Sequence, residues 1–97
     1  MIIKNLDKAG ALLDLINTKR LRSGLVILQP GEEVGLHVTN NCEEVIIVLE
    51  GQATIYLKDQ KQKVETNQLI YIPCDESHNV KNETDKILRY IYLVSLN

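Results

Sequence analysis

The sequence has 97 residues, 44% of them apolar, and a formal net charge of −2 from 11 basic and 13 acidic residues. This length predicts one domain over residues 1–97, with a core of Leu, Ile and Val because Phe and Trp are absent. The chain lacks a basic stripe and a run of roughly 18 apolar residues, so we expect no nucleic-acid and no membrane partner. Its short apolar start is unlike a signal peptide. We therefore expect a cytoplasmic protein in which Cys42 and Cys74 are free thiols.

The first segment is predicted to form a short helix. Asn5 is a suitable N-cap, Asp7 lies in the first turn, and Lys19 and Arg20 follow the end, so each charge suits the helix dipole. Gly10 in the middle weakens the helix. The apolar positions form a one-sided stripe: Leu6, Leu12, Leu13 and Ile16. This helix would plug or flank the domain.

From residue 21 onwards, the pattern predicts about eight short strands separated by turn residues. The expected strands are 21–28, 34–39, 44–49, 53–58, 62–65, 68–72, 78–81 and 86–94. The alternation in 53–58 places Ala53, Ile55 and Leu57 on one face, and the polar segment 62–65 suits an edge strand. Such spacing is typical of an all-β sandwich or barrel. Strands that are apolar at every position, such as VIIVL, indicate two stacked sheets that are covered on both faces.

Four polar side chains stand out along these strands. His37 and Thr39 are two residues apart and therefore point to the same face, Glu44 follows a short asparagine turn, and His78 lies beyond Pro73. Two imidazoles and one carboxylate form the set that suits a divalent transition metal and leaves coordination positions open. Taken one by one, the same residues are also explained as a strand histidine, a solvated glutamate and a turn histidine. Spacing alone leaves both interpretations open.

The residues around these side chains resemble the two motifs of the cupin superfamily. GEEVGLHVTNNCEEVIIVLEG, residues 31–51, follows the first motif, Gly-x5-His-x-His-x3–4-Glu-x6-Gly. NQLIYIPCDESHNVKN, residues 67–82, follows the second, Gly-x5-Pro-x-Gly-x2-His-x3-Asn. The resemblance implies an all-β fold, a single small β-barrel or double-stranded β-helix (a jelly roll), here with the short N-terminal helix. It also implies that His37, Glu44 and His78 hold the metal, with Glu44 preferred to Glu43 by its distance from Gly51.

Three positions depart from the family pattern. Asn67 and Asp75 stand where the family has glycine, and both residue types tolerate a left-handed backbone, so the turns are expected to survive. Thr39 stands where the family has its second histidine of the first motif. A hydroxyl is a poor ligand for a transition metal but can hold water or a small molecule, so Thr39 is a candidate ligand-binding residue. Cys42 lies in the turn beside the candidate site, and Cys74 follows Pro73 in the second motif. Either cysteine could be a soft extra ligand or a reactive thiol, or simply a small half-buried residue.

Two functions remain open on this basis. The first is a metal-binding cupin in which His37, Glu44 and His78 hold Fe, Mn, Ni or Zn, with open positions for an oxygenase, isomerase or decarboxylase reaction. The second is a non-catalytic binder of a sugar, a nucleotide sugar or an organic acid that has lost its metal. A structural dimer with an inactive site is a further alternative, whereas a DNA-binding regulator has no room for its second module. No catalytic residue is assigned, and a homodimer is expected because strands such as 88–94 are apolar on both faces.

Overall fold

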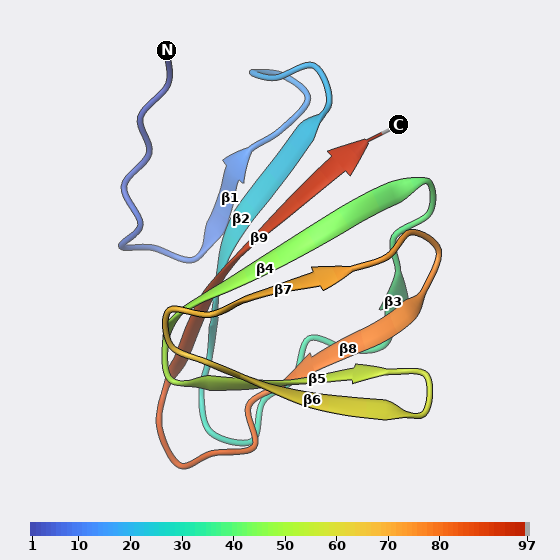
Figure 1. Cartoon of the computed structure of the whole chain (residues 1–97). Helices are drawn as coiled ribbons and strands as arrows, with labels where there is room; N and C mark the ends of the chain where they lie inside the picture. The colour runs from blue at the N-terminus through green and yellow to red at the C-terminus, as the bar shows by residue number, and fades with distance from the viewer. Residues whose placement is uncertain (97) are drawn as a thin grey trace.

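The computed structural model describes residues 1–96 and consists of two antiparallel sheets packed face to face (Figure 1). The larger sheet has the strand order β1-β2-β9-β4-β7 and the smaller sheet has the order β3-β8-β5-β6. The strands are β1 (Gly10–Leu13), β2 (Leu21–Leu28), β3 (His37–Val38), β4 (Cys42–Glu50), β5 (Gln52–Leu57), β6 (Gln60–Glu65), β7 (Leu69–Ile72), β8 (Ser77–Lys81) and β9 (Leu88–Leu96). The predicted all-β architecture of two stacked sheets is confirmed. In the described part of the chain, no helix has the length and apolar character to span a membrane.

The core lies between the two sheets and is almost entirely aliphatic. Along β4, Ile46 and Val48 face inward and are fully buried, whereas Val45 and Ile47 face outward and are half-buried. The predicted inward face of β5 is also confirmed, since Ala53 and Ile55 belong to the core and Leu57 packs against it. The buried cluster contains Leu28, Ile46, Val48, Ala53, Ile55, Val64, Ile72, Val80, Leu88 and Tyr90. Each fully buried large side chain contributes about 1.5–3 kcal/mol to folding.

The predicted N-terminal helix is wrong, because residues 1–96 contain no helix. Gly10 has a φ of +138°, which a right-handed helix does not allow, and strand β1 instead pairs with the edge of β2. A turn follows β1, in which the side chain of Asp14 accepts hydrogen bonds from the backbone N–H groups of Ile16 and Asn17. Ile16 was expected on the packed face but is 95% exposed. A short amphipathic stripe needs a partner surface to remain helical, and here the sheet edge offers better backbone hydrogen bonds.

Most strand boundaries agree with the predicted ones to within two residues, but the segment 34–39 does not. Only His37 and Val38 form a strand there, because Gly35 has a φ of +110° and interrupts the extended backbone. The backbone N–H of Gly35 donates to the side-chain carbonyl of Asn79 (2.8 Å) instead of to a neighbouring strand. The polar segment at β6 lies at the edge of its sheet, as predicted.

Both substituted glycine positions adopt the left-handed backbone that the motif requires. Asn67 has a φ of 67° and Asp75 a φ of 64°, so the prediction that these turns survive is confirmed. Asp75 also ties the two motifs together, since its carboxylate accepts a hydrogen bond from the N–H of Asn41 (2.9 Å) and its own N–H donates to the carbonyl of Thr39 (3.1 Å). The exchange of glycine for aspartate thus adds a contact between motifs that glycine could not make.

Asn82, the last residue of the second motif, supports the fold. It is 1% exposed, and its side-chain amide donates to the carbonyls of Leu28 (3.0 Å) and Lys86 (2.8 Å). Its side-chain oxygen accepts from the N–H and hydroxyl of Thr84. The residue therefore joins the end of β2 to the loop before β9, with its buried polar atoms paired.

Candidate metal centre

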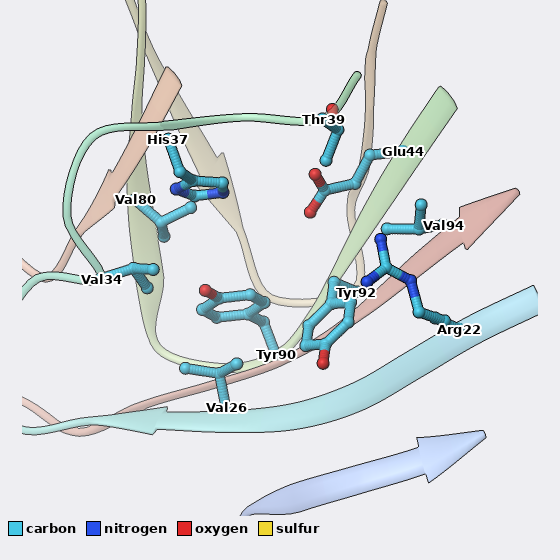
Figure 2. A pocket seen from close by; sticks show the side chains of 10 residues that line it. All are labelled: Arg22, Val26, Val34, His37, Thr39, Glu44, Val80, Tyr90, Tyr92 and Val94. Atoms are coloured by element: carbon cyan, nitrogen blue, oxygen red, sulfur yellow. The ribbon is translucent and has the colours of Figure 1, made fainter. Parts of the chain in front are cut away.

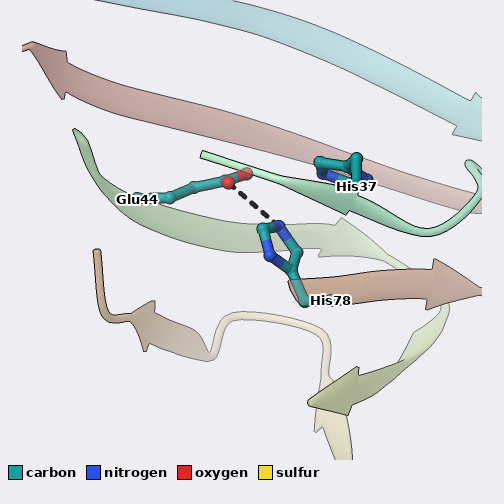
Figure 3. Close-up of side chains that lie close together, drawn as sticks. All are labelled: His37, Glu44 and His78. Carbon is teal, nitrogen blue, oxygen red and sulfur yellow. Dashed lines mark hydrogen bonds and ion pairs between the residues drawn. The ribbon is translucent and has the colours of Figure 1, made fainter. Parts of the chain in front are cut away.

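Three of the predicted site residues meet between the two sheets (Figure 3). His37 on β3 and His78 on β8 are direct partners in the strand register, and Glu44 reaches them from β4 in the facing sheet. Each residue offers one ligand atom, and these atoms lie within 4.8 Å of one another. The two imidazole rings meet edge to face with centroids 4.2 Å apart. The two histidines and the glutamate, which lie up to 41 positions apart in the sequence, are therefore brought together by strand pairing and sheet stacking.

Each histidine is oriented by a backbone carbonyl. His37 directs Nδ1 to the carbonyl of Gly35 (2.8 Å), and His78 directs Nδ1 to the carbonyl of Glu76 (3.0 Å). A carbonyl can only accept, so each Nδ1 carries the proton, and each Nε2 is left to face the cluster. Carbonyl partners of this kind fix the tautomer and the ring plane of metal-binding histidines.

Glu44 and His78 form a buried pair. His78 Nε2 lies 3.1 Å from Glu44 Oε1, with His78 0% and Glu44 5% exposed. Burial opposes the charged imidazolium and would lower its pKa, but the hydrogen bonds to Glu44 and to the carbonyl of Glu76, with the charge of Glu44, outweigh it. The net effect raises the pKa of His78 above its ordinary value. A bound cation would take the place of the proton on His78 Nε2 that lies between the imidazole and the Glu44 carboxylate.

Thr39 lies next to this group and has an unsatisfied hydroxyl. Its Oγ1 is buried and has no hydrogen-bond partner within residues 1–96. Thr39 lines the same cavity as His37 and Glu44, and Figure 2 shows it beside the carboxylate of Glu44. An orphaned hydroxyl at this point suits a water or ligand atom bound at the centre. The donor set and this hydroxyl together fit a divalent cation that keeps some non-protein ligands.

The neighbouring residues that the sequence raised as alternatives lie outside the group. Glu43 faces the opposite side of β4, where its carboxylate accepts a hydrogen bond from the hydroxyl of Tyr71. Cys42 and Cys74 are free thiols and are not among the clustered ligand atoms. Burial and the neighbouring Asp75 raise the pKa of Cys74, which makes this thiol less reactive at neutral pH.

A cavity of about 260 Å³ opens beside the cluster (Figure 2). Sequence reasoning missed most of its lining, because half of the lining residues come from β2 and β9, outside both motifs, and the motif residues Val34 and Val80 carry no functional signal. Arg22 in particular carries no motif signal, although the strand period could have placed it on the same face as Val26. The lining consists of Arg22, Val26, Val34, His37, Thr39, Glu44, Val80, Tyr90, Tyr92 and Val94.

A small jelly roll that gathers two histidines and one glutamate between its sheets has the architecture of a cupin. The chain belongs to the cupin domain family, whose profile matches residues 24–94. The resemblance noted in the two sequence motifs is thereby confirmed.

Individual relatives show the breadth of this family. Auxin-binding protein 1 of Arabidopsis thaliana is 29% identical over 102 aligned residues, which cover 96% of this chain and 50% of that protein. A cupin protein from Bacteroides fragilis has a TM-score of 0.86 at 16% identity, covering 99% of this chain and 82% of that one. A predicted oxalate decarboxylase from Thermotoga maritima has a TM-score of 0.82 at 21% identity, covering 92% and 79%. The structural likenesses concern the fold, and the chain spans half or less of the first curated relatives it matches.

Proposed function

We propose that the protein binds one divalent transition metal ion through His37, Glu44 and His78. The observation that carries the proposal is the convergence of three ligand atoms within 4.8 Å, with both histidines held by backbone carbonyls so that Nε2 faces the centre. Iron, manganese, nickel and zinc all accept two imidazoles and a carboxylate. Such an ion, when bound, would act as a Lewis acid towards a molecule in the adjoining cavity.

The metal content of the purified protein tests this proposal. Protein prepared without a metal-affinity tag should take up about one Fe, Mn, Ni or Zn ion per chain. Glu44→Gln and His78→Ala should lose this uptake, whereas Glu43→Gln should retain it, because Glu43 points to the opposite face of the same strand. Uptake should also weaken as the pH falls through the raised pKa of His78, since the metal must displace a proton. Failure to take up any of the four ions, or equal uptake by the Glu43 and Glu44 variants, would contradict the proposal.

A second candidate function is the binding of a small molecule without a metal. Thr39 favours it, because this residue provides a hydroxyl where a fourth metal ligand stands in the family pattern. The cavity beside the cluster supports it as well, and one relative is named as a binding protein. The metal measurement separates the two candidates, since a metal-independent binder would show no uptake in any variant.

We further propose that the chain forms a homodimer through the outer face of the larger sheet. The register places Leu69, Ile47 and Ile91 in one row across β7, β4 and β9, and Tyr71, Val45 and Leu93 in the next row. Leu69 is 60% and Tyr71 52% exposed, and the other four are half-buried. A contiguous apolar face of this kind favours a second copy.

Sedimentation tests the dimer with a pair of charge substitutions. Ile47→Glu, at the centre of the apolar rows, should convert the dimer to monomer, because a charge at the core of an interface is costly to desolvate. Gln62→Glu, on the exposed edge strand β6, should leave it dimeric. A single 11.0 kDa species for the unmodified chain would contradict the proposal.

A further inference from the structure

The cavity beside the candidate metal centre has a broad apolar wall, with the polar residues Arg22, His37, Thr39 and Glu44 also in its lining. Four valines and the rings of Tyr90 and Tyr92 form most of its lining. A sugar needs several hydrogen-bonding partners along its length, and this wall does not provide them. The volume of about 260 Å³ is below the usual range for drug-sized ligands, roughly 300–1,000 Å³, and is too small for a nucleotide sugar. The ligand that fits is small and mainly apolar.

Arg22 provides a permanent positive charge at this cavity. In the strand register it pairs with Val94, and it lies on the same face of β2 as Val26, which packs against the core. Figure 2 shows its guanidinium extending from β2 along the cavity past Val94. Over residues 1–96, no carboxylate lies within ion-pair distance of Arg22, and its side chain makes no hydrogen bond. The Glu44 carboxylate, which also lines the cavity, is already paired with His78.

The hydroxyl groups of Thr39 and Tyr90 also line the cavity. The Thr39 hydroxyl lacks a partner, and Tyr90, which is 2% exposed, makes no side-chain hydrogen bond within the described residues. Burial, the charge of Glu44 and the neighbouring Tyr92 raise the pKa of Tyr90, so it remains a neutral phenol that can donate. An anionic ligand would therefore find the Arg22 cation and two hydroxyl donors beside apolar side chains, with the Glu44 carboxylate already paired with His78. A guanidinium is planar and matches a carboxylate with two parallel hydrogen bonds.

We propose that this cavity binds a small carboxylic acid with an apolar body, whose carboxylate pairs with Arg22 and whose body lies against Tyr90, Tyr92 and the valines. The inference rests on the proposed function only in placing the ligand beside the metal centre. Arg22 is a specificity-determining residue in this arrangement, because it selects the charged acid over a neutral molecule of the same shape.

Binding of paired acids and amides to the chelator-treated protein tests this inference without any contribution from metal coordination. Suitable probes are isobutyrate, benzoate and phenylacetate, each compared with its own amide, with affinity measured by calorimetry and the Nε–H signal of Arg22 followed by NMR. At least one acid should bind about ten- to a hundredfold more tightly than its amide, as expected for a charge-assisted pair. The Arg22 signal should shift on binding.

Variants at two arginines identify the source of the preference. Arg22→Gln should abolish the preference for acid over amide, and Arg22→Lys should restore part of it. Arg20→Gln should leave the preference unchanged, because Arg20 is exposed like Arg22 but lies outside the cavity lining. Equal binding of acid and amide in all three pairs, or an intact preference in Arg22→Gln, would overturn the inference. Metal uptake by the same samples is scored separately. Retained uptake without acid preference refutes only this inference, whereas acid preference without metal uptake refutes only the proposed metal site.

Discussion

Replacing Thr39 with histidine should raise the affinity of the protein for a divalent transition metal about a hundredfold. Thr39 lies on the same face as His37, beside the Glu44 carboxylate, and its hydroxyl has no partner within residues 1–96 (Figure 2). Four-ligand zinc sites in small domains bind with about 10–16 kcal/mol, so one ligand contributes about 3 kcal/mol, or roughly a hundredfold. The substitution would provide the fourth ligand that the family motif has at this position.

Val38→His is the matched control for this experiment. It adds the same side chain one position earlier, where the strand period directs it away from the cluster and the native valine is 44% exposed. Competition with a chromophoric chelator measures both affinities. A higher metal affinity in Thr39→His, with no change in Val38→His, supports a metal centre that the side chain of residue 39 can reach. Equal affinities for Thr39→His and the unmodified protein would show that position 39 does not reach the metal.

The second large effect concerns the two glycines that bound the first motif. Gly31 and Gly51 have nearly the same φ, 83° and 82°, but different surroundings. A Cβ at Gly31 would meet nothing within 4 Å, whereas a Cβ at Gly51 would lie 2.3 Å from the carbonyl oxygen of Ile87. That oxygen belongs to the backbone of the residue just before β9 and cannot rotate away as a side chain could. Alanine at Gly51 must therefore displace one sheet strand or the turn between β4 and β5.

We expect Gly31→Ala to lower the free energy of unfolding by about 1–2 kcal/mol, the cost of a left-handed backbone in a residue with a Cβ. Gly51→Ala should cost about 1–3 kcal/mol more, because overpacking adds to the same backbone strain. A domain with a total stability of roughly 5–15 kcal/mol would then be close to unfolding. Urea denaturation followed by circular dichroism measures both variants. Equal losses in the two variants would show that the turn relaxes away from Ile87.

Local patterns in the sequence predict many of the strands, the turns of the two motifs and the glutamate of the candidate metal centre. Strand β2 begins and ends where expected, and β5 has the predicted inward face, because a two-residue alternation records burial directly. Asn67 and Asp75 replace glycine without loss of the turns, which follows from the local tolerance of these residue types for positive φ. The choice of Glu44 over Glu43 rests on the motif spacing, and the structure places Glu44 beside the histidines.

The N-terminal helix shows where local reasoning fails. A stripe of apolar residues with a cap predicts a helix only if a surface is present to receive the stripe. The open edge of β2 instead accepts the backbone of β1, and Gly10 adopts a conformation that a helix excludes. The hydrophobic period of the segment cannot reveal this competition, because the paired residues of β2 lie 10–15 positions further along the chain and their free edge exists only in the folded sheet.

The sequence by itself determined the class of fold, the two motifs and the three residues of the candidate centre, because these depend on spacing along the chain. Only the tertiary structure decided what surrounds them. Arg22 and Tyr90 come from β2 and β9, outside the motifs, and reach the cavity because β9 pairs with β4 and β2 pairs with β9 in the sheet that faces His37 and His78. Within residues 1–96, the unsatisfied hydroxyl of Thr39 and the lack of an ion-pair partner for Arg22 are likewise properties of packing, since both depend on which groups the fold brings near them.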